Sequence, residues 1–255
     1  MNGLLGLIDR PVHAVRRIGA TVLFLFKIVA QVPAALRKPG YIVEQIYNAG
    51  GRSLIIIMLS GLFVGMVLGL QGFDLLQRFG SEDALGVAAA LGLLKELGPV
   101  VTALLFAGRA GTALTSEIGL MRATDQLTAM QMMAVDPVRR VVAPRFLGGL
   151  IAVPLLTAIF NVVGVFGAQL IGVSVMGVDS GSFWSQMQSA VQTDDVMEGI
   201  IKSIVFGAAC SLVAVYEGYH AAPTAAGVGL ATTSTVVTSS VLILFLDYIL
   251  TAAFL

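Results

Sequence analysis

Long apolar stretches alternate with short polar connections along this chain, and five of the stretches are long enough to cross a membrane. A crossing helix needs about 20 apolar residues, because the hydrocarbon layer is about 30 Å thick. We therefore expect an all-α membrane protein in which residues 53–255 form a five-span domain. The predicted spans are Ser53–Phe73, Ala84–Gly108, Phe146–Val178, Glu198–Glu217 and Val228–Leu255.

The third stretch differs from the others in length, since residues 146–178 carry no charge at all. At 1.5 Å per residue, such a stretch is too long for one upright helix across a bilayer. We expect a long helix here, followed by a short extended or re-entrant tail.

The N-terminal region, residues 1–52, is predicted to form interfacial helices. Its apolar stretch Ile18–Leu36 contains Lys27 and Pro33 and is flanked by pairs of basic residues. This pattern is typical of an amphipathic helix that lies in the membrane surface. The alternative is a sixth span.

Charged residues are distributed unequally between the two sides of the predicted bundle. Residues 1–52 and 109–145 hold 12 of the 15 Lys and Arg residues, whereas 74–83 and 177–199 hold seven acidic residues and one basic residue. Basic loops stay in the cytoplasm. We therefore expect a cytoplasmic N-terminus and a periplasmic C-terminus, which requires an odd number of spans.

Composition narrows the function classes. Hydrophobic residues make up 57% of the chain and charged residues 12%, with a mean hydropathy of +0.91, which excludes an ordinary soluble domain. Lys and Arg balance Asp and Glu at 15 each, so no basic excess favours nucleic-acid binding. We find no phosphate-binding loop and no metal-ligand motif. We expect no catalysis, metal or cofactor in this chain, and any ATP use must come from another protein.

Two pairs of charged residues fall at predicted membrane depth, where ionisable groups usually serve a function. Lys95 and Glu96 lie near mid-membrane, just before Pro99, which should kink or break the helix. This arrangement favours a substrate or ion site, and the alternative is a buried structural ion pair. Lys202 and Asp247 each lie about two turns from the outer end of a span, so we expect them to pair.

The first span combines small and large apolar residues. Gly61, Gly65 and Gly69 recur every four residues, which allows close helix packing either within the chain or in a dimer. Large apolar side chains lie opposite and beyond them, and this lining suits an amphiphile with apolar tails. These residues are Leu68, Leu75, Leu76 and Phe79.

The long cytoplasmic loop contains a predicted helix at Ser116–Val135, which Asp136 and Pro137 terminate. Its apolar positions are rich in Met, which suits insertion into a groove of a partner protein. The alternative is a helix that only packs on the membrane surface.

Four segments of the chain closely resemble the MlaE-type permeases, the membrane subunits of bacterial ABC transporters that maintain outer-membrane lipid asymmetry. The first two are GLFVGMVLGLQG at 61–72 and the block LLKELGPVVTALLFAGRAGTALTSEIGLMRATDQLTAMQMMAVDPVRRVVAPR at 93–145. The others are residues 223–237 and the terminal LDYILTA. The resemblance covers almost the whole chain.

This resemblance implies a phospholipid permease of the Gram-negative inner membrane. It implies five spans preceded by interfacial helices, and two copies of the chain per transporter. The implied partners are a cytoplasmic ABC ATPase that binds ATP and Mg²⁺, a STAS-domain protein on that ATPase, a hexameric MCE-domain periplasmic protein and a periplasmic lipid-binding shuttle. The cargo would be glycerophospholipid, with the direction of movement left open.

The resemblance also implies site residues. A lipid pocket at the outward-facing dimer interface would include Leu68, Leu75, Leu76, Phe79, Lys95, Glu96 and Leu97. Some related proteins have Arg at the position of Lys95, and Lys offers a phosphate only a point charge. Lys202 and Asp247 match polar intramembrane positions of the family. The coupling helix would contact the ATPase through Glu117, Gly119, Arg122, Asp125, Gln126, Met130 and Asp136.

Two other functions fit parts of the pattern. A proton-coupled carrier of lipids or other amphiphiles could use Glu96 and Asp247 as relay groups, but the long cytoplasmic helix would then have no purpose. A scaffold that only anchors partner proteins would tolerate a charge at Leu68.

Overall fold

The protein is built entirely from helices in the part of the chain that the structure describes. This computed structural model describes the backbone of residues 2–36 and 39–254, and the side chains from residue 19 onward within those ranges. The helices are α1 (Asn2–Leu36), α2 (Pro39–Ala49), α3 (Leu54–Gln77), α4 (Leu85–Leu91), α5 (Gly98–Phe106), α6 (Thr112–Ala123), α7 (Gln126–Met132), α8 (Ala143–Ser174), α9 (Ser180–Ala190), α10 (Thr193–His220) and α11 (Ala225–Phe254).

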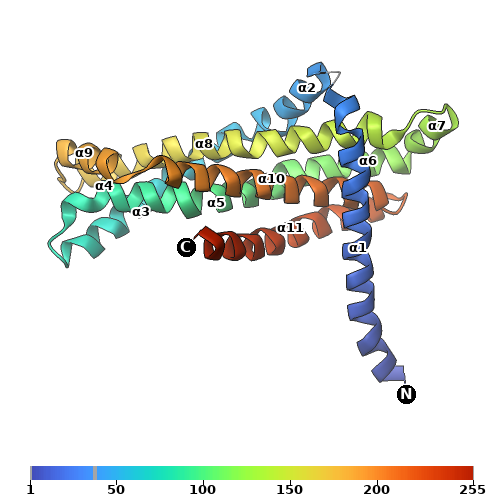
Figure 1. The fold of residues 1–255 in the computed structure, drawn as a ribbon, viewed down its shortest axis with the longest axis horizontal. Coiled ribbons are helices and arrows are strands. Elements are labelled where there is room, and N and C mark those ends of the chain that lie inside the picture. Colours follow the sequence, from blue (N-terminus) through green and yellow to red (C-terminus); the bar gives the residue numbers. More distant parts are fainter. Residues whose placement is uncertain (1, 37–38, 255) are drawn as a thin grey trace.

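The long helices α3, α8, α10 and α11 run together with the series α4–α6 along one axis, and α1 crosses this axis near one end (Figure 1). The crosswise course of α1 fits a helix that lies in the membrane surface. By length and composition, six described segments could span a membrane: Gly19–Leu36, Pro39–Gln77, Glu82–Ala123, Val138–Ser174, Thr193–His220 and Ala225–Phe254. The chain is thus a multi-helix membrane protein, and the five-span layout stays a prediction. Leu255, the predicted end of the last span, lies outside the described residues.

The glycine repeat of α3 packs against α8 of the same chain. A Cβ added to Gly65 would lie 1.8 Å from the carbonyl oxygen of Gly164, and one added to Gly61 would lie 2.9 Å from that of Phe160. The backbones therefore touch, as they do where small residues line a helix interface. Within this chain, the repeat serves internal packing.

Pro99 does not break its helix, because the series from α4 to α6 continues through it. Wider π-helical turns occur at Gly92–Leu97, just before the proline, and at Ala107–Gly111. Pro99 cannot donate a hydrogen bond to the carbonyl of Lys95. The extra residue in the π turn absorbs the distortion that a proline causes in a regular α-helix.

The structure has two helices where one was predicted at Ser116–Val135. The helix α6 ends at Ala123, Asp125 adopts a left-handed conformation (φ 57°), and α7 then covers Gln126–Met132. Asp tolerates this conformation better than most residues. The single-helix prediction is wrong because apolar spacing carries no information about one left-handed residue within the run.

The third predicted span agrees with the structure. The helix α8 continues for 32 residues to Ser174 and is followed by a short non-helical tail, Val175–Asp179. The short helix α9, which the sequence analysis did not predict, begins immediately after this tail. The side chain of Asp179 accepts a hydrogen bond from the backbone N–H of Ser182 at 2.7 Å and caps it.

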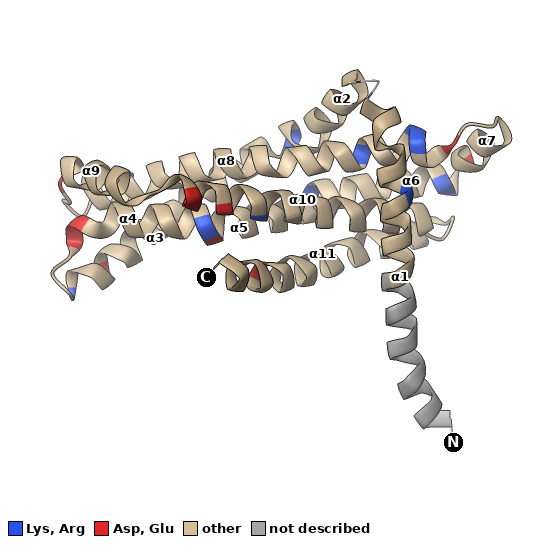
Figure 2. Cartoon of the chain, in the orientation of Figure 1, with Lys and Arg blue, Asp and Glu red and all other residues tan. Residues whose placement is uncertain are grey.

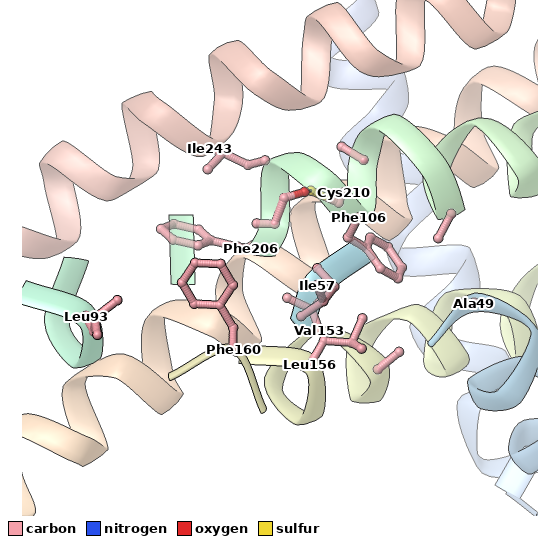
Figure 3. Close-up of a cluster of buried hydrophobic side chains, with 14 residues drawn as sticks. Ala49, Ile57, Leu93, Phe106, Val153, Leu156, Phe160, Phe206, Cys210 and Ile243 are labelled. Carbon is pink, nitrogen blue, oxygen red and sulfur yellow. The ribbon is translucent and has the colours of Figure 1, made fainter. Parts of the chain in front are cut away.

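The core lies where α5, α8 and α10 meet. Phe106, Phe160, Phe206 and the single cysteine Cys210 are fully buried there, with Ile243 of α11 closing one side (Figure 3). This packed centre fixes the helices that carry the intramembrane charges.

Candidate functional site

A cluster of charged side chains lies where the first turns of α10 meet the π-helical turn Gly92–Leu97 and the last turns of α11. Figure 2 shows Lys and Asp or Glu residues next to each other where α10 passes the α4–α5 region. The cluster starts from Lys95 and Glu96 in the π-helical turn Gly92–Leu97. Successive helical residues point about 100° apart, so the two side chains reach different neighbours.

Lys202 on α10 is the buried centre of the cluster, with 0% of its side chain exposed. Its ammonium donates to Glu96 Oε1 at 2.9 Å, to Thr251 Oγ1 at 2.8 Å and to the carbonyl oxygen of Lys95 at 2.9 Å. These three bonds use all three donors of the ammonium. The carbonyl of Lys95 is the one that Pro99 leaves without its usual helical donor.

The structure brings Lys202 and Asp247 together, as the depth argument predicted. Their closest charged atoms, Nζ and Oδ1, are 3.9 Å apart. This Oδ1 is buried and accepts no hydrogen bond from any described residue. Asp247 thus contributes to the cluster through charge rather than through a hydrogen bond.

Lys95 is bound by two carboxylates of the first turns of α10. Its ammonium lies 2.9 Å from Glu198 Oε2 and 3.3 Å from Asp195 Oδ1. Glu198 also lies 3.3 Å from the ammonium of Lys202 through its other oxygen. Glu198 therefore links the two lysines, and the cluster is one connected network.

Sequence reasoning missed three members of this network: Asp195, Glu198 and Thr251. A usable signal was present for two of them, because Asp195, Glu198 and Lys202 follow helical spacing and share one face of α10. Thr251 gave no such signal, since hydroxyls are common in apolar helices.

The charges of the cluster do not balance. Two lysines face four carboxylates, which gives a formal net charge of −2 when all six groups are ionised. Burying charge in an apolar medium is costly unless partners and hydrogen bonds compensate it. Ionisable groups on membrane-spanning helices usually serve a function, so this network is the candidate site.

The apolar residues expected to line the lipid pocket occupy different surroundings. Leu68 and Leu97 pack against the core cluster, and Leu76 packs against the small cluster of Leu85, Val178 and Phe183. Two others, Leu75 and Phe79, are exposed at the end of α3, with 57% and 75% of their surface accessible. A single copy of the chain therefore does not gather all seven predicted residues into one cavity.

One described hollow lies elsewhere, on the outer side of α8 and α10. It measures about 440 Å³ and is lined mainly by apolar side chains, with Trp184 of α9 among them. None of the seven predicted pocket residues lines this hollow, and no charged side chain lines it either.

The residues expected to contact an ATPase divide into two groups. Glu117 forms an ion pair with Arg145 at 3.3 Å, and Arg122 donates to the carbonyl oxygen of Tyr219, so both attach the loop to neighbouring helices. Gly119 packs close to Val228, and Met130 packs with buried Leu127. The remaining three are exposed at the surface: Asp125, Gln126 and Asp136.

Two further methionines form the exposed end of this region. Met132 and Met133 have 83% and 68% of their surface accessible. Large apolar side chains at such exposure are typical of a contact with another molecule. Among the described residues, no group of three or more His, Cys, Asp or Glu side chains could hold a metal ion.

Comparisons with known proteins agree with this architecture. The family model described as Permease MlaE matches residues 42–253. The intermembrane phospholipid transport system permease protein MlaE of Haemophilus influenzae is 52% identical over 93% of this chain and 91% of its own length. A "probable ABC transporter permease protein" of Rickettsia conorii is 36% identical over 96% of this chain and 95% of its own. The chloroplastic protein TRIGALACTOSYLDIACYLGLYCEROL 1 of Arabidopsis thaliana is 32% identical over 83% of this chain and 61% of its own.

Proposed function

Because the chain belongs to the MlaE permease family, we propose that it is the membrane subunit of an ATP-driven phospholipid transporter in a Gram-negative inner membrane. It moves glycerophospholipid between that membrane and a periplasmic lipid carrier, and so maintains the lipid asymmetry of the outer membrane. The Haemophilus relative carries phospholipid transport in its name, which supports this cargo.

The observation that carries the proposal is the connected charge cluster on the helices that we predict to span the membrane. Lys95 and Glu96 expose 35% and 41% of their side chains, whereas Lys202 behind them is fully buried. A lipid headgroup would meet the two exposed charges, while its tails lie along apolar residues of α3 such as Leu75 and Phe79. A pathway for small ions would be lined by more hydroxyls and carbonyls.

Two copies of the chain would complete the pocket. Only 11% of the most apolar stretch of α11 is buried within the chain, although this helix carries Asp247 and Thr251 of the cluster. In the proposed dimer, the second copy would cover part of this face. Leu244, Phe245 and Tyr248 are more than half exposed on it.

The energy would come from a separate ABC ATPase that binds ATP and Mg²⁺. The α6–α7 region with Met132 and Met133 would dock on it, and nucleotide binding would bring the two docking regions together. Closure would then compress the pocket and expel the lipid, because nucleotide binds the closed state more tightly than the open one. An MCE-domain hexamer and a lipid shuttle would receive or deliver lipid on the periplasmic side, and a STAS-domain protein would bind the ATPase.

A reconstituted transfer assay tests the proposal. The chain is purified with its co-purifying proteins, incorporated in liposomes with fluorescent phospholipid, and lipid movement is measured with and without ATP. We expect transfer that requires ATP and persists with a protonophore. Transfer that needs a proton gradient instead would favour a proton-coupled carrier.

A pocket variant adds a sharper control. Leu75→Arg places a charge among the proposed tail contacts and should reduce transfer by about tenfold, since an unpaired charge against a lipid tail costs about 1.4 kcal/mol or more. Gln77→Arg puts the same side chain two positions away, on the opposite side of the last turn of α3, and should transfer normally. Equal transfer by both variants, with normal assembly, would show that the chain is only a scaffold.

A further inference from the structure

A second hollow, with a basic lining, lies where α1 and α2 meet the segment that leads into α8. It measures about 350 Å³, and its wall comes from the last turn of α1, the first turn of α2 and residues 134–144. Its polar side chains are those of Arg139, Arg140, Tyr41 and Asp136. No residue of the charge cluster described above lines it, so this hollow is separate from the proposed transport site.

The two arginines present donors that no described residue uses. Arg139 is exposed and forms neither a hydrogen bond nor an ion pair with any described residue. Arg140 is held in place by Tyr41, because its Nη2 donates to the phenol oxygen at 2.9 Å and its guanidinium carbon lies 5.0 Å from the ring centre. The other donors of Arg140 bond to no described residue. A guanidinium presents its N–H groups as a planar fork that matches the oxygens of a phosphate.

The single carboxylate of the hollow does not neutralise these arginines. Oδ1 of Asp136 accepts a hydrogen bond from the backbone N–H of Val138 at 2.9 Å, within its own turn. Among the described residues, Asp136 forms no ion pair with either arginine. The three charged side chains that line the hollow therefore have a formal net charge of +1, and an anion would complete the site.

The surroundings of the hollow are typical of a membrane surface. The helix α1 crosses the axis of the bundle beside it, and Leu23 and Phe26 on α1 are about two-thirds exposed (Figure 1). Val43 and Tyr47 on α2 are exposed to the same extent. Helices with exposed apolar side chains lie in the interface of a bilayer, where Tyr is also frequent.

We propose that this hollow binds the phosphate headgroup of an anionic phospholipid in the cytoplasmic leaflet. The phosphate meets Arg139 and Arg140, while the tails lie along the exposed apolar residues of α1 and α2. Basic pockets beside membrane helices on the cytoplasmic side bind such headgroups, and the anionic lipids of that leaflet attract basic residues. This lipid is a bound ligand rather than cargo, so the inference goes beyond the proposed function.

An acidic surface of a partner protein is the other occupant that two arginines could attract. The wall of the hollow favours lipid, because Ala34 and Ala35 belong to the apolar helix α1. A headgroup at Arg139 can stay connected to tails beside α1, whereas a soluble partner would have to enter the headgroup layer to reach it.

Photo-crosslinking tests where the lipid binds. The full chain, purified in mild detergent with its co-purifying proteins, is incubated with phosphatidylglycerol that carries a photoreactive group near the start of one acyl chain. After irradiation and digestion, mass spectrometry identifies the modified peptides. We expect crosslinks within residues 39–47 and 134–144. Unlabelled phosphatidylglycerol should compete for these crosslinks, whereas phosphatidylcholine and inorganic phosphate at the same concentration should compete much less.

Arg139→Gln is the variant that tests the proposal most directly. Since Arg139 has no bond to a described residue, its replacement should leave the fold intact. The affinity for phosphatidylglycerol, measured by competition, should fall about fivefold, the contribution of one basic residue close to an anionic lipid surface. The matched control is Arg52→Gln, which removes the same charge from an exposed position that does not line the hollow. Its affinity should be unchanged.

Four results would overturn the proposal. Equal losses in Arg139→Gln and Arg52→Gln would show a general attraction to basic surface instead of a site. Crosslinks that map away from residues 39–47 and 134–144 would place the lipid elsewhere. Competition by inorganic phosphate as strong as that by phosphatidylglycerol would indicate a site for soluble anions. Crosslinks that appear only after the co-purifying proteins are removed would show that a partner protein occupies the hollow.

Discussion

At the scale of single residues, Lys202 determines whether the charge cluster is stable. It is the only cation within bonding distance of Glu96 and is within 3.9 Å of Asp247 among the described residues. Its three donors each have a close acceptor, one of which is a backbone carbonyl left free by Pro99. Removal of one partner from a buried pair usually costs more than the pair itself contributes, because an uncompensated charge remains.

We therefore predict that Lys202→Met lowers the free energy of unfolding by about 3–5 kcal/mol, the range seen when one member of a buried ion pair is removed. Asp247→Asn should cost much less, because its contact with Lys202 is long and involves no hydrogen bond. Thermal melting of the detergent-purified protein measures both. Similar melting temperatures for the two variants would contradict the central role of Lys202.

At the scale of the elements, the contact between α3 and α8 is set by glycines whose backbones touch. Gly65 faces Gly164, with no room for a single carbon atom between them. A glycine that makes no such close contact lowers the stability of its helix. Replacing it with alanine is then neutral or stabilising by up to about 1 kcal/mol.

Gly65→Ala should lower the melting temperature by several degrees, since the two helices must move apart and the core against Phe160 must repack. The matched control is Gly229→Ala in α11, where an added carbon meets nothing within 4 Å. Stability loss is expected to be about 1–3 kcal/mol for Gly65→Ala, the usual cost of overpacking. If Gly65→Ala loses no stability, or if Gly229→Ala loses as much, then α3 and α8 pack less closely than the structure indicates.

At the scale of the whole molecule, the open question is how the helices cross the membrane. The helices α3, α8, α10 and α11 and the series α4–α6 run along one axis, and α1 crosses them (Figure 1). Lys and Arg are most frequent toward the end of the bundle that carries α6 and α7, whereas Asp and Glu lie toward the α9 end and along α10 (Figure 2). This distribution supports a cytoplasmic location for the end that carries α6 and α7.

Cysteine labelling tests this orientation. The single native thiol, Cys210, is buried and can be replaced by alanine. In that background, Asp194→Cys should react with a membrane-impermeant maleimide from the periplasmic side. Asp136→Cys should react only after the inner membrane is opened. For an interfacial α1, Gly19→Cys should behave like Asp136→Cys, and labelling of Gly19→Cys from outside would indicate a sixth span.

The positions of the long helices could largely be predicted from the sequence. In a membrane, the backbone must satisfy its hydrogen bonds within a helix, so the length of each apolar run largely determines the element. The same logic placed Lys202 and Asp247 at one depth, where the structure brings them together.

The tertiary structure decided which groups meet. The sequence did not indicate that Lys95 would bind to Asp195 and Glu198, because helix packing sets which side chains approach across 100 positions of chain. It did not indicate the left-handed conformation of Asp125 or the continuous helix through Pro99. The backbone conformation of one residue does not change the spacing of apolar residues along the chain. Local patterns determine where a helix forms, whereas contacts between distant residues depend on how the helices rotate and pack against one another.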